Sequence, residues 1–224
     1  MVLRSLLVTP WILLAGAAPL SAQNPAPAPA APAPGENVVK ADPVPADLSA
    51  SAQAAVEKLG LEVVAGRYQT AINRMYPQWK ARMAKRAGGM KALDEQLAAV
   101  PQILQQGGIT LLSSKPYGTP QVFQVAPGKR IEKVDGRDTP VLVYTKWLVI
   151  VPTVTRLKVA QDGTTSLGER TSFQAAISDK GKYDWTFIDG SSVNAAELRG
   201  LFLTLPETLV LPKVGGREIK EGTK

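Results

Sequence analysis

Three aspartates in the last third of the chain are the side chains best suited by type to acid–base chemistry. Asp179, Asp184 and Asp189 lie close together in the sequence, and a carboxylate that reaches a substrate proton can act as a general base. However, Asp179 precedes Lys180-Gly181 and Asp189 precedes Gly190-Ser191. Aspartate in such positions usually organises a turn through hydrogen bonds to its own backbone. The spacing therefore favours turn roles over catalysis.

If one of these carboxylates is catalytic, Asp189 is the candidate. It alternates with Trp185 and Phe187 along one expected strand, so the three side chains share a face. Tyr68 or Tyr144 is the expected hydroxyl partner for proton transfer. This interpretation describes a small hydrolase or isomerase that uses an apolar pocket, and it is the alternative to a protein that only binds or assembles.

The sequence excludes several other chemistries. It contains no histidine and no cysteine, so a Ser-His-Asp triad, a Cys-His pair and a zinc site of ordinary ligands are all impossible. Disulfides and a lipid-modified cysteine are excluded for the same reason. No glycine-rich phosphate loop follows a strand. We therefore expect no metal and no cofactor.

The aromatic residues suggest a second kind of site, an apolar ligand pocket. Its expected lining is Tyr68, Tyr144, Trp147, Trp185 and Phe187. Aromatic side chains on strands more often form core than line a pocket, and we favour the core role for most of them.

A basic run around Gly88-Gly89 is the third candidate. The formal net charge is +7, and an exported basic protein meets anionic envelope polymers or lipids before it meets nucleic acid, which we do not expect as a partner. A solvated helix face is the simpler explanation of the run, because long cationic side chains commonly cover such faces. The residues concerned are Lys80, Arg82, Lys85, Arg86 and Lys91.

The N-terminal residues predict where the protein works. Arg4 precedes an apolar run over residues 6–18, which ends in small residues up to Ala22, and this is the layout of a secretory signal peptide. The run is shorter than the roughly 20 residues of a membrane-spanning helix. We predict cleavage after Ala22 and export to the periplasm or out of the cell. Residues 23–46 are rich in proline and alanine and predict an extended spacer.

One domain is expected over residues 47–213, with a polar tail over residues 214–224. Its first half has helical periodicity. Asp47 or Ser49 is expected to cap a helix that runs to about Tyr76, and Pro77 breaks or kinks it. Helical character resumes over residues 78–86 and again from Leu93, with a kink at Pro101 and an end at Gly107-Gly108.

The second half changes to strand-like patterns. Hairpin turns are expected at Pro127-Gly128-Lys129, Gln161-Asp162-Gly163 and Asp179-Lys180-Gly181, and Asn194 predicts a cap for a short helix over 195–202. The expected strands cover residues 109–115, 121–126, 141–151, 153–160, 170–178 and 183–189. Helices first and a meander of strands afterwards predict an α+β domain, with the helices on one face of an antiparallel sheet.

The run Val141–Val151 is apolar at both alternating sets of positions, which predicts a strand covered on both faces. Helices can cover one face. We expect a homodimer or the C-terminal segment, with Leu209, Val210 and Leu211, to cover the other.

Several short runs resemble a known group of secreted bacterial proteins. They are Tyr76-Pro77, Val151-Pro152-Thr153 and Trp185-Thr186-Phe187-Ile188-Asp189-Gly190, in that order after a long helix. The resemblance is to the nuclear-transport-factor-like and cystatin-like group, and it implies a cone-like fold in which helices wrap a bent antiparallel sheet. It implies no reaction, because that broader fold hosts both enzymes and binding modules. The sequence thus favours an exported, non-enzymatic binding or assembly module whose ligand is unknown.

Overall fold

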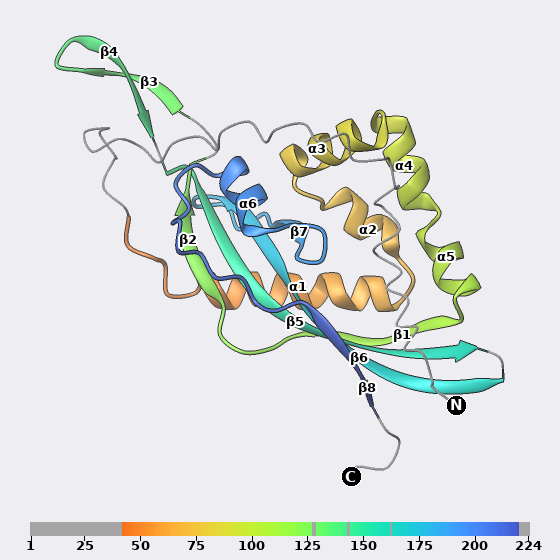
Figure 1. The fold of residues 1–224 in the computed structure, drawn as a ribbon. Coiled ribbons are helices and arrows are strands. Elements are labelled where there is room, and N and C mark those ends of the chain that lie inside the picture. The colour runs from red at the N-terminus through yellow and green to blue at the C-terminus, as the bar shows by residue number, and fades with distance from the viewer. Residues whose placement is uncertain (1–41, 127–128, 143, 162, 220–224) are drawn as a thin grey trace.

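The computed structural model describes residues 42–126, 129–142, 144–161 and 163–219. The predicted signal peptide, most of the predicted spacer and the first two residues of the turn at Pro127-Gly128-Lys129 lie outside these ranges. Within them, helices and a mostly antiparallel sheet form the predicted α+β arrangement (Figure 1).

Five helices form the first half of the domain. They are α1 (Leu48–Val64), α2 (Tyr68–Asn73), α3 (Pro77–Ala87), α4 (Met90–Ala98) and α5 (Val100–Gln106). The prediction of one helix up to Tyr76 is wrong, because α1 ends at Val64 and the chain turns at Gly66, where φ is +78°. Such a φ interrupts a helix and favours glycine. Pro77 lies at the start of α3, where its missing N–H costs nothing.

The main sheet contains six strands. Four lie in the order β1 (Ile109–Pro116), β5 (Lys146–Gln161), β6 (Thr164–Asp179) and β7 (Thr186–Asp189). In addition, β2 (Gln121–Val125) pairs with β5, and β8 (Gly215–Ile219) pairs with β6. The residues predicted as a polar tail from 214 thus include a strand of the sheet.

A separate hairpin projects from the body of the molecule (Figure 1). It consists of β3 (Lys129–Val134) and β4 (Arg137–Leu142), which pair only with each other among the described strands. The predicted strand over residues 141–151 is therefore wrong at its start, since Val141 and Leu142 end β4 and the long strand begins at Lys146.

Pro152 lies inside β5 instead of separating two strands as predicted. Residues 153–159 of β5 pair with β1, whereas residues 146–150 pair with β2. The carbonyl of Pro152 faces this junction, where it accepts a hydrogen bond from the Tyr117 N–H at 3.0 Å. The N–H that proline lacks would point to the same side, away from β6, so the long β5–β6 ladder tolerates it.

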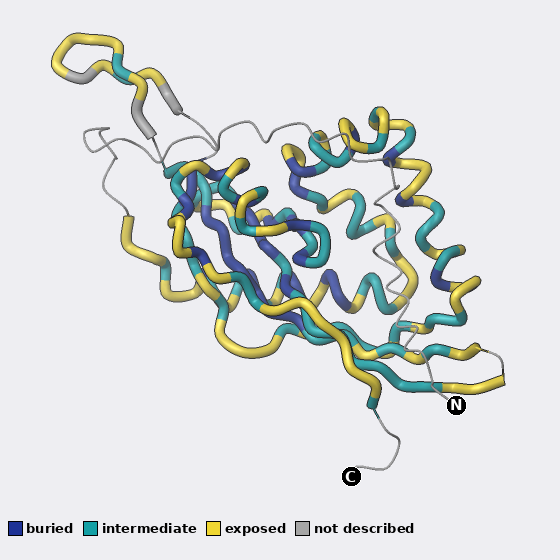
Figure 2. Tube along the Cα trace, viewed as in Figure 1, coloured by how far each residue is buried: buried dark blue, intermediate teal, exposed yellow. Residues whose placement is uncertain are grey.

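The two faces of the sheet carry different cores. On one face α1 covers Trp147, Val149 and Val151, whose neighbours include Ala176 and Phe187. The strands drawn dark blue at the centre of Figure 2 are buried between the cores on their two faces. The face of β5 that carries Leu148 and Ile150 belongs to the second core.

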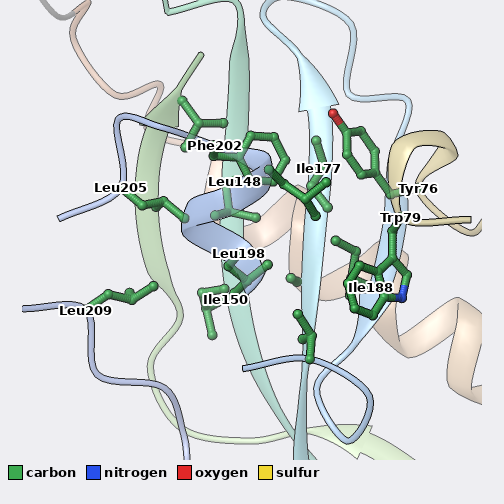
Figure 3. Close-up of a cluster of buried hydrophobic side chains, with 14 of the residues drawn as sticks. Tyr76, Trp79, Leu148, Ile150, Ile177, Ile188, Leu198, Phe202, Leu205 and Leu209 are labelled. Carbon is green, nitrogen blue, oxygen red and sulfur yellow. The ribbon is translucent and has the colours of Figure 1, made fainter. Parts of the chain in front are cut away.

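That second face is covered by the C-terminal part of the same chain (Figure 3). Helix α6 (Ala195–Leu201) begins at Asn194, whose side chain accepts a hydrogen bond from the Glu197 N–H, as the sequence predicted. Leu198 and Leu201 of this helix lie in the core. The residues that follow it continue the cover with Phe202, Leu205 and Leu209. Of the two predicted covers, the C-terminal segment thus lies over this face.

Candidate functional site

A cavity of about 210 Å³ lies between the helices and the sheet face beneath α1. Each of the five N-terminal helices contributes apolar side chains to its wall. These residues are Val56, Leu59 and Val63 of α1, Tyr68, Ala71 and Ile72 of α2, Trp79 and Met83 of α3, Leu93 and Leu97 of α4, and Val100 and Leu104 of α5. A hydrocarbon body placed there would lose most of its contact with water.

The strands give the cavity a polar floor. Along β5 the face that carries Val149 and Val151 beneath α1 continues as Thr153 and Thr155. The same alternation on β6 places three polar side chains along the cavity. The polar lining residues of the sheet are Ser114, Thr153, Thr155, Arg170, Ser172, Gln174 and Asp189. The site therefore combines apolar walls with hydrogen-bonding groups on one side.

Asp189 lines this cavity but also holds the turn that follows β7, as its sequence context predicted. One carboxylate oxygen accepts hydrogen bonds from the Ser191 N–H at 2.7 Å and from the Ser191 hydroxyl. The other accepts from Nε2 of Gln174, its neighbour on β6, at 3.1 Å. Its lone pairs are thus largely occupied by the protein itself.

The packing around Gly190 explains why the run Trp185–Gly190 ends in glycine. A Cβ atom at this residue would lie 2.5 Å from the ring of Phe173, which is fully buried. The Gly190 N–H also donates to the Phe173 carbonyl at 2.8 Å. Glycine is required here because the backbone passes directly against the aromatic ring.

The five predicted pocket residues divide into three groups. Tyr68 and Phe187 line the cavity together with Asp189. Trp147 and Trp185 are core residues beneath α1, and the Trp185 indole N–H donates to Ser51 Oγ at 3.0 Å. Tyr144 is not among the cavity residues; its ring faces the Lys180 ammonium at 5.7 Å.

The basic run serves mainly to attach helices to each other. Arg82 donates to the backbone carbonyls of Glu197 and Gly200 in α6, and Arg86 pairs with the Glu197 carboxylate. Lys80 pairs with Asp94 at 3.0 Å, and Lys91 lies 3.9 Å from Glu95. Lys85 is exposed in the last turn of α3. Two of the five cations are therefore committed to holding α6.

Sequence reasoning missed Arg170 and Ser172. Arg170 begins one of the predicted strands, and the alternation Arg170, Ser172, Gln174 is typical of a face exposed to solvent. A possible signal was that the next residues of the same alternation, Ala176 and Ser178, are small. In the structure both are buried.

Comparison with protein-family models, curated proteins and solved structures finds no significant match to this chain. Among the described residues, no helix has the length and apolar character needed to cross a membrane. The same ranges contain no group of acidic side chains arranged to hold a metal ion.

Proposed function

We propose that the protein is an exported binding module that takes a small, largely apolar molecule into the cavity between α1–α5 and the sheet. The observation that carries this proposal is the cavity itself, with walls contributed by all five helices. Apolar area removed from water stabilises a complex by about 25 cal/mol per Å² before the costs of association are subtracted. The observed lining can therefore supply affinity without any reacting group.

The hydrolase or isomerase alternative rests on Tyr68 and Asp189, which both line the cavity. Catalysis by Asp189 would require a free lone pair aimed at a substrate proton. Ser191 and Gln174 already occupy this carboxylate, which supports binding over catalysis. D189N would abolish an activity of this kind, whereas it would leave the affinity for a neutral apolar probe nearly unchanged.

A neutral fluorescent probe, N-phenyl-1-naphthylamine, tests the proposed binding. We expect its fluorescence to rise on addition of the protein and the rise to saturate. Ala71→Phe should reduce the affinity because the new ring would occupy the cavity, whereas Ala54→Phe places the same ring on the exposed side of α1 and serves as the control. Circular dichroism of both variants verifies folding, and Ser172→Leu fills the cavity from the opposite side if Ala71→Phe fails to fold. Equal probe binding by all these proteins would overturn the proposal.

Export is the second part of the proposal, and it is supported by the composition of residues 1–22. Protein isolated from its own host should begin near Gln23 and carry no lipid. Mass spectrometry of the intact protein gives both results in one measurement. An intact Met1 on the isolated protein would contradict export with cleavage. Export implies contact with the envelope, where an anionic polymer remains a proposed partner for the exposed cations.

A further inference from the structure

Arg170 is a cation without a partner at the floor of the cavity. Within the described ranges, its guanidinium makes no ion pair and no hydrogen bond. By contrast, the two arginines nearby on the opposite face of the same sheet have a carboxylate partner. Arg156 and Arg217 both pair with Glu169, at 3.4 Å and 2.6 Å. An arginine that lines a cavity and is left unpaired retains five N–H donors for a ligand.

Ser172 adds a second unsatisfied group on the same face. It follows Arg170 by two residues on β6, so the two side chains lie roughly 7 Å apart on one side of the sheet. Its hydroxyl is buried and has no hydrogen-bond partner. A buried hydroxyl without a hydrogen-bond partner has lost its contact with water and gained nothing in return, which destabilises the fold. A ligand acceptor between Arg170 and Ser172 would remove this cost.

The acidic group in the cavity, Asp189, is not paired with Arg170. Asp189 pairs in register with Gln174, four residues from Arg170 on β6. At about 3.3 Å per residue, this places the backbone positions of the two residues roughly 13 Å apart along the sheet, and no ion pair joins their side chains. The carboxylate is in addition held by Ser191 and Gln174. The cation is therefore free to receive an anion.

The strands beside Arg170 leave room for such an anion. On β5 its cross-strand partner is Thr155, whose hydroxyl already donates to Ser114 Oγ at 3.1 Å. On β8 its partner is Gly216, which has no side chain to cover the guanidinium. Cross-strand partners share a face of the sheet, so the flank toward β8 is open at this position.

From these observations we infer that the ligand is an amphipathic anion, whose acidic head group binds Arg170 and Ser172 while its apolar body lies against the helices. The inference rests on the proposed function, because it concerns the same cavity. A guanidinium presents two parallel N–H donors to a carboxylate or a phosphate, and these charge-assisted bonds are about twice as strong as neutral ones. The head group thus selects the ligand and the helices provide most of the contact area.

Displacement of N-phenyl-1-naphthylamine by octanoate and by octan-1-ol tests the inference. The two competitors share an alkyl chain and differ in the charge of the head group. We expect the wild-type protein to bind octanoate about tenfold more tightly than octan-1-ol, and Arg170→Gln to abolish this preference while it retains octan-1-ol binding. Arg156→Gln removes the same charge from the opposite face and should keep the preference. Ser172→Ala should weaken octanoate binding several-fold.

The possible results separate the two proposals. Probe binding with equal affinities for octanoate and octan-1-ol, or a preference that survives in Arg170→Gln, would overturn the anionic ligand and leave the binding function intact. Failure of the wild-type protein to bind the probe and both competitors would overturn both. Octyl phosphate as a third competitor distinguishes the two head groups, since tighter binding than octanoate identifies a phosphate ligand and weaker binding a carboxylate. An octyl phosphate affinity no better than that of octan-1-ol would restrict the inference to carboxylates.

Discussion

At the scale of single residues, the contact between Gly190 and Phe173 has a measurable consequence. Gly190→Ala forces the buried ring to move, because the new methyl carbon would lie 2.5 Å from it. Overpacking of this kind typically lowers the free energy of unfolding by about 1–3 kcal/mol. Gly215→Ala is the matched control, since the nearest atom to its added Cβ, Thr171 Oγ1, lies 3.9 Å away. Denaturant unfolding of the two variants would refute the packing argument if both lost equal stability.

Tyr76 predicts a response to alkaline pH. Its hydroxyl is buried without a hydrogen-bond partner, and burial, with a smaller contribution from the nearby Asp179 charge, raises its pKa to about 12. In the unfolded chain this phenol ionises near pH 10. Its neutral form therefore contributes stability that is complete below pH 10 and lost as the pH rises toward 12.

Tyr76→Phe should consequently be more resistant to unfolding between pH 10 and 12 than the wild-type protein. At neutral pH the variant should be as stable or more stable by up to about 1 kcal/mol, since it removes an unpaired buried hydroxyl. Tyr117→Phe changes an exposed phenol and is the control. Parallel alkaline unfolding curves for the wild-type protein and Tyr76→Phe would contradict the assignment.

At the scale of elements, α6 depends on cations from α3. Arg82 donates to two carbonyls of α6, and one of them, that of Gly200, lies in the last turn, where carbonyls lack a partner within the helix. Arg82→Gln should lower the free energy of unfolding by about 1.5–3 kcal/mol, the range for hydrogen bonds to charged groups. Lys85→Gln, at an exposed position of the same helix, should have almost no effect. Thermal unfolding measures both, and equal melting temperatures would show that Arg82 does not stabilise α6.

The elements that the sequence predicted well depend on local chemistry. The cap at Asn194 and the glycine turns at Gly163 and Gly181, where φ is +74° and +78°, are determined by a few neighbouring residues. The continuous strand through Pro152 was not predictable in this way, because proline is tolerated only where the partner of β5 changes from β1 to β2. The same holds for β8, whose partner lies over forty residues away in sequence.

The candidate site shows the same division. Tyr68, Phe187 and Asp189 were predictable as cavity residues from their types and from the alternation around Asp189. Arg170 and Ser172 were not, because a polar strand face lines a cavity only where helices pack over the sheet without filling the space above that face. Whether such a space remains depends on how the five helices are joined, which no local pattern in the sequence determines.

At the scale of the whole molecule, the second sheet face is covered by the chain's own C-terminal part. Deletion of residues 205–224 would remove Leu205 and Leu209 from the core over Leu148 and Ile150, together with strand β8. We expect a protein of residues 23–224 to sediment as a monomer and one of residues 23–204 to associate, since exposed apolar patches favour association. A dimer in both forms would instead support pairing through another surface. Monomers in both would show that α6 alone suffices as a cover.

The two ends of the described chain lie near opposite ends of strand β6. Near its end, Lys180 Nζ bonds the Asp42 carboxylate and the Gln124 amide oxygen, each at 2.7 Å. Near its beginning, β8 pairs from Leu167 to Thr171. A pulling force applied between residues 42 and 219 would therefore run lengthwise along β6. It would load the β8 hydrogen bonds in shear, where all must yield together, instead of opening them one at a time. At the other end, residue 42 leads directly into α1, so the same tension would also act on a helix that forms part of the cavity wall.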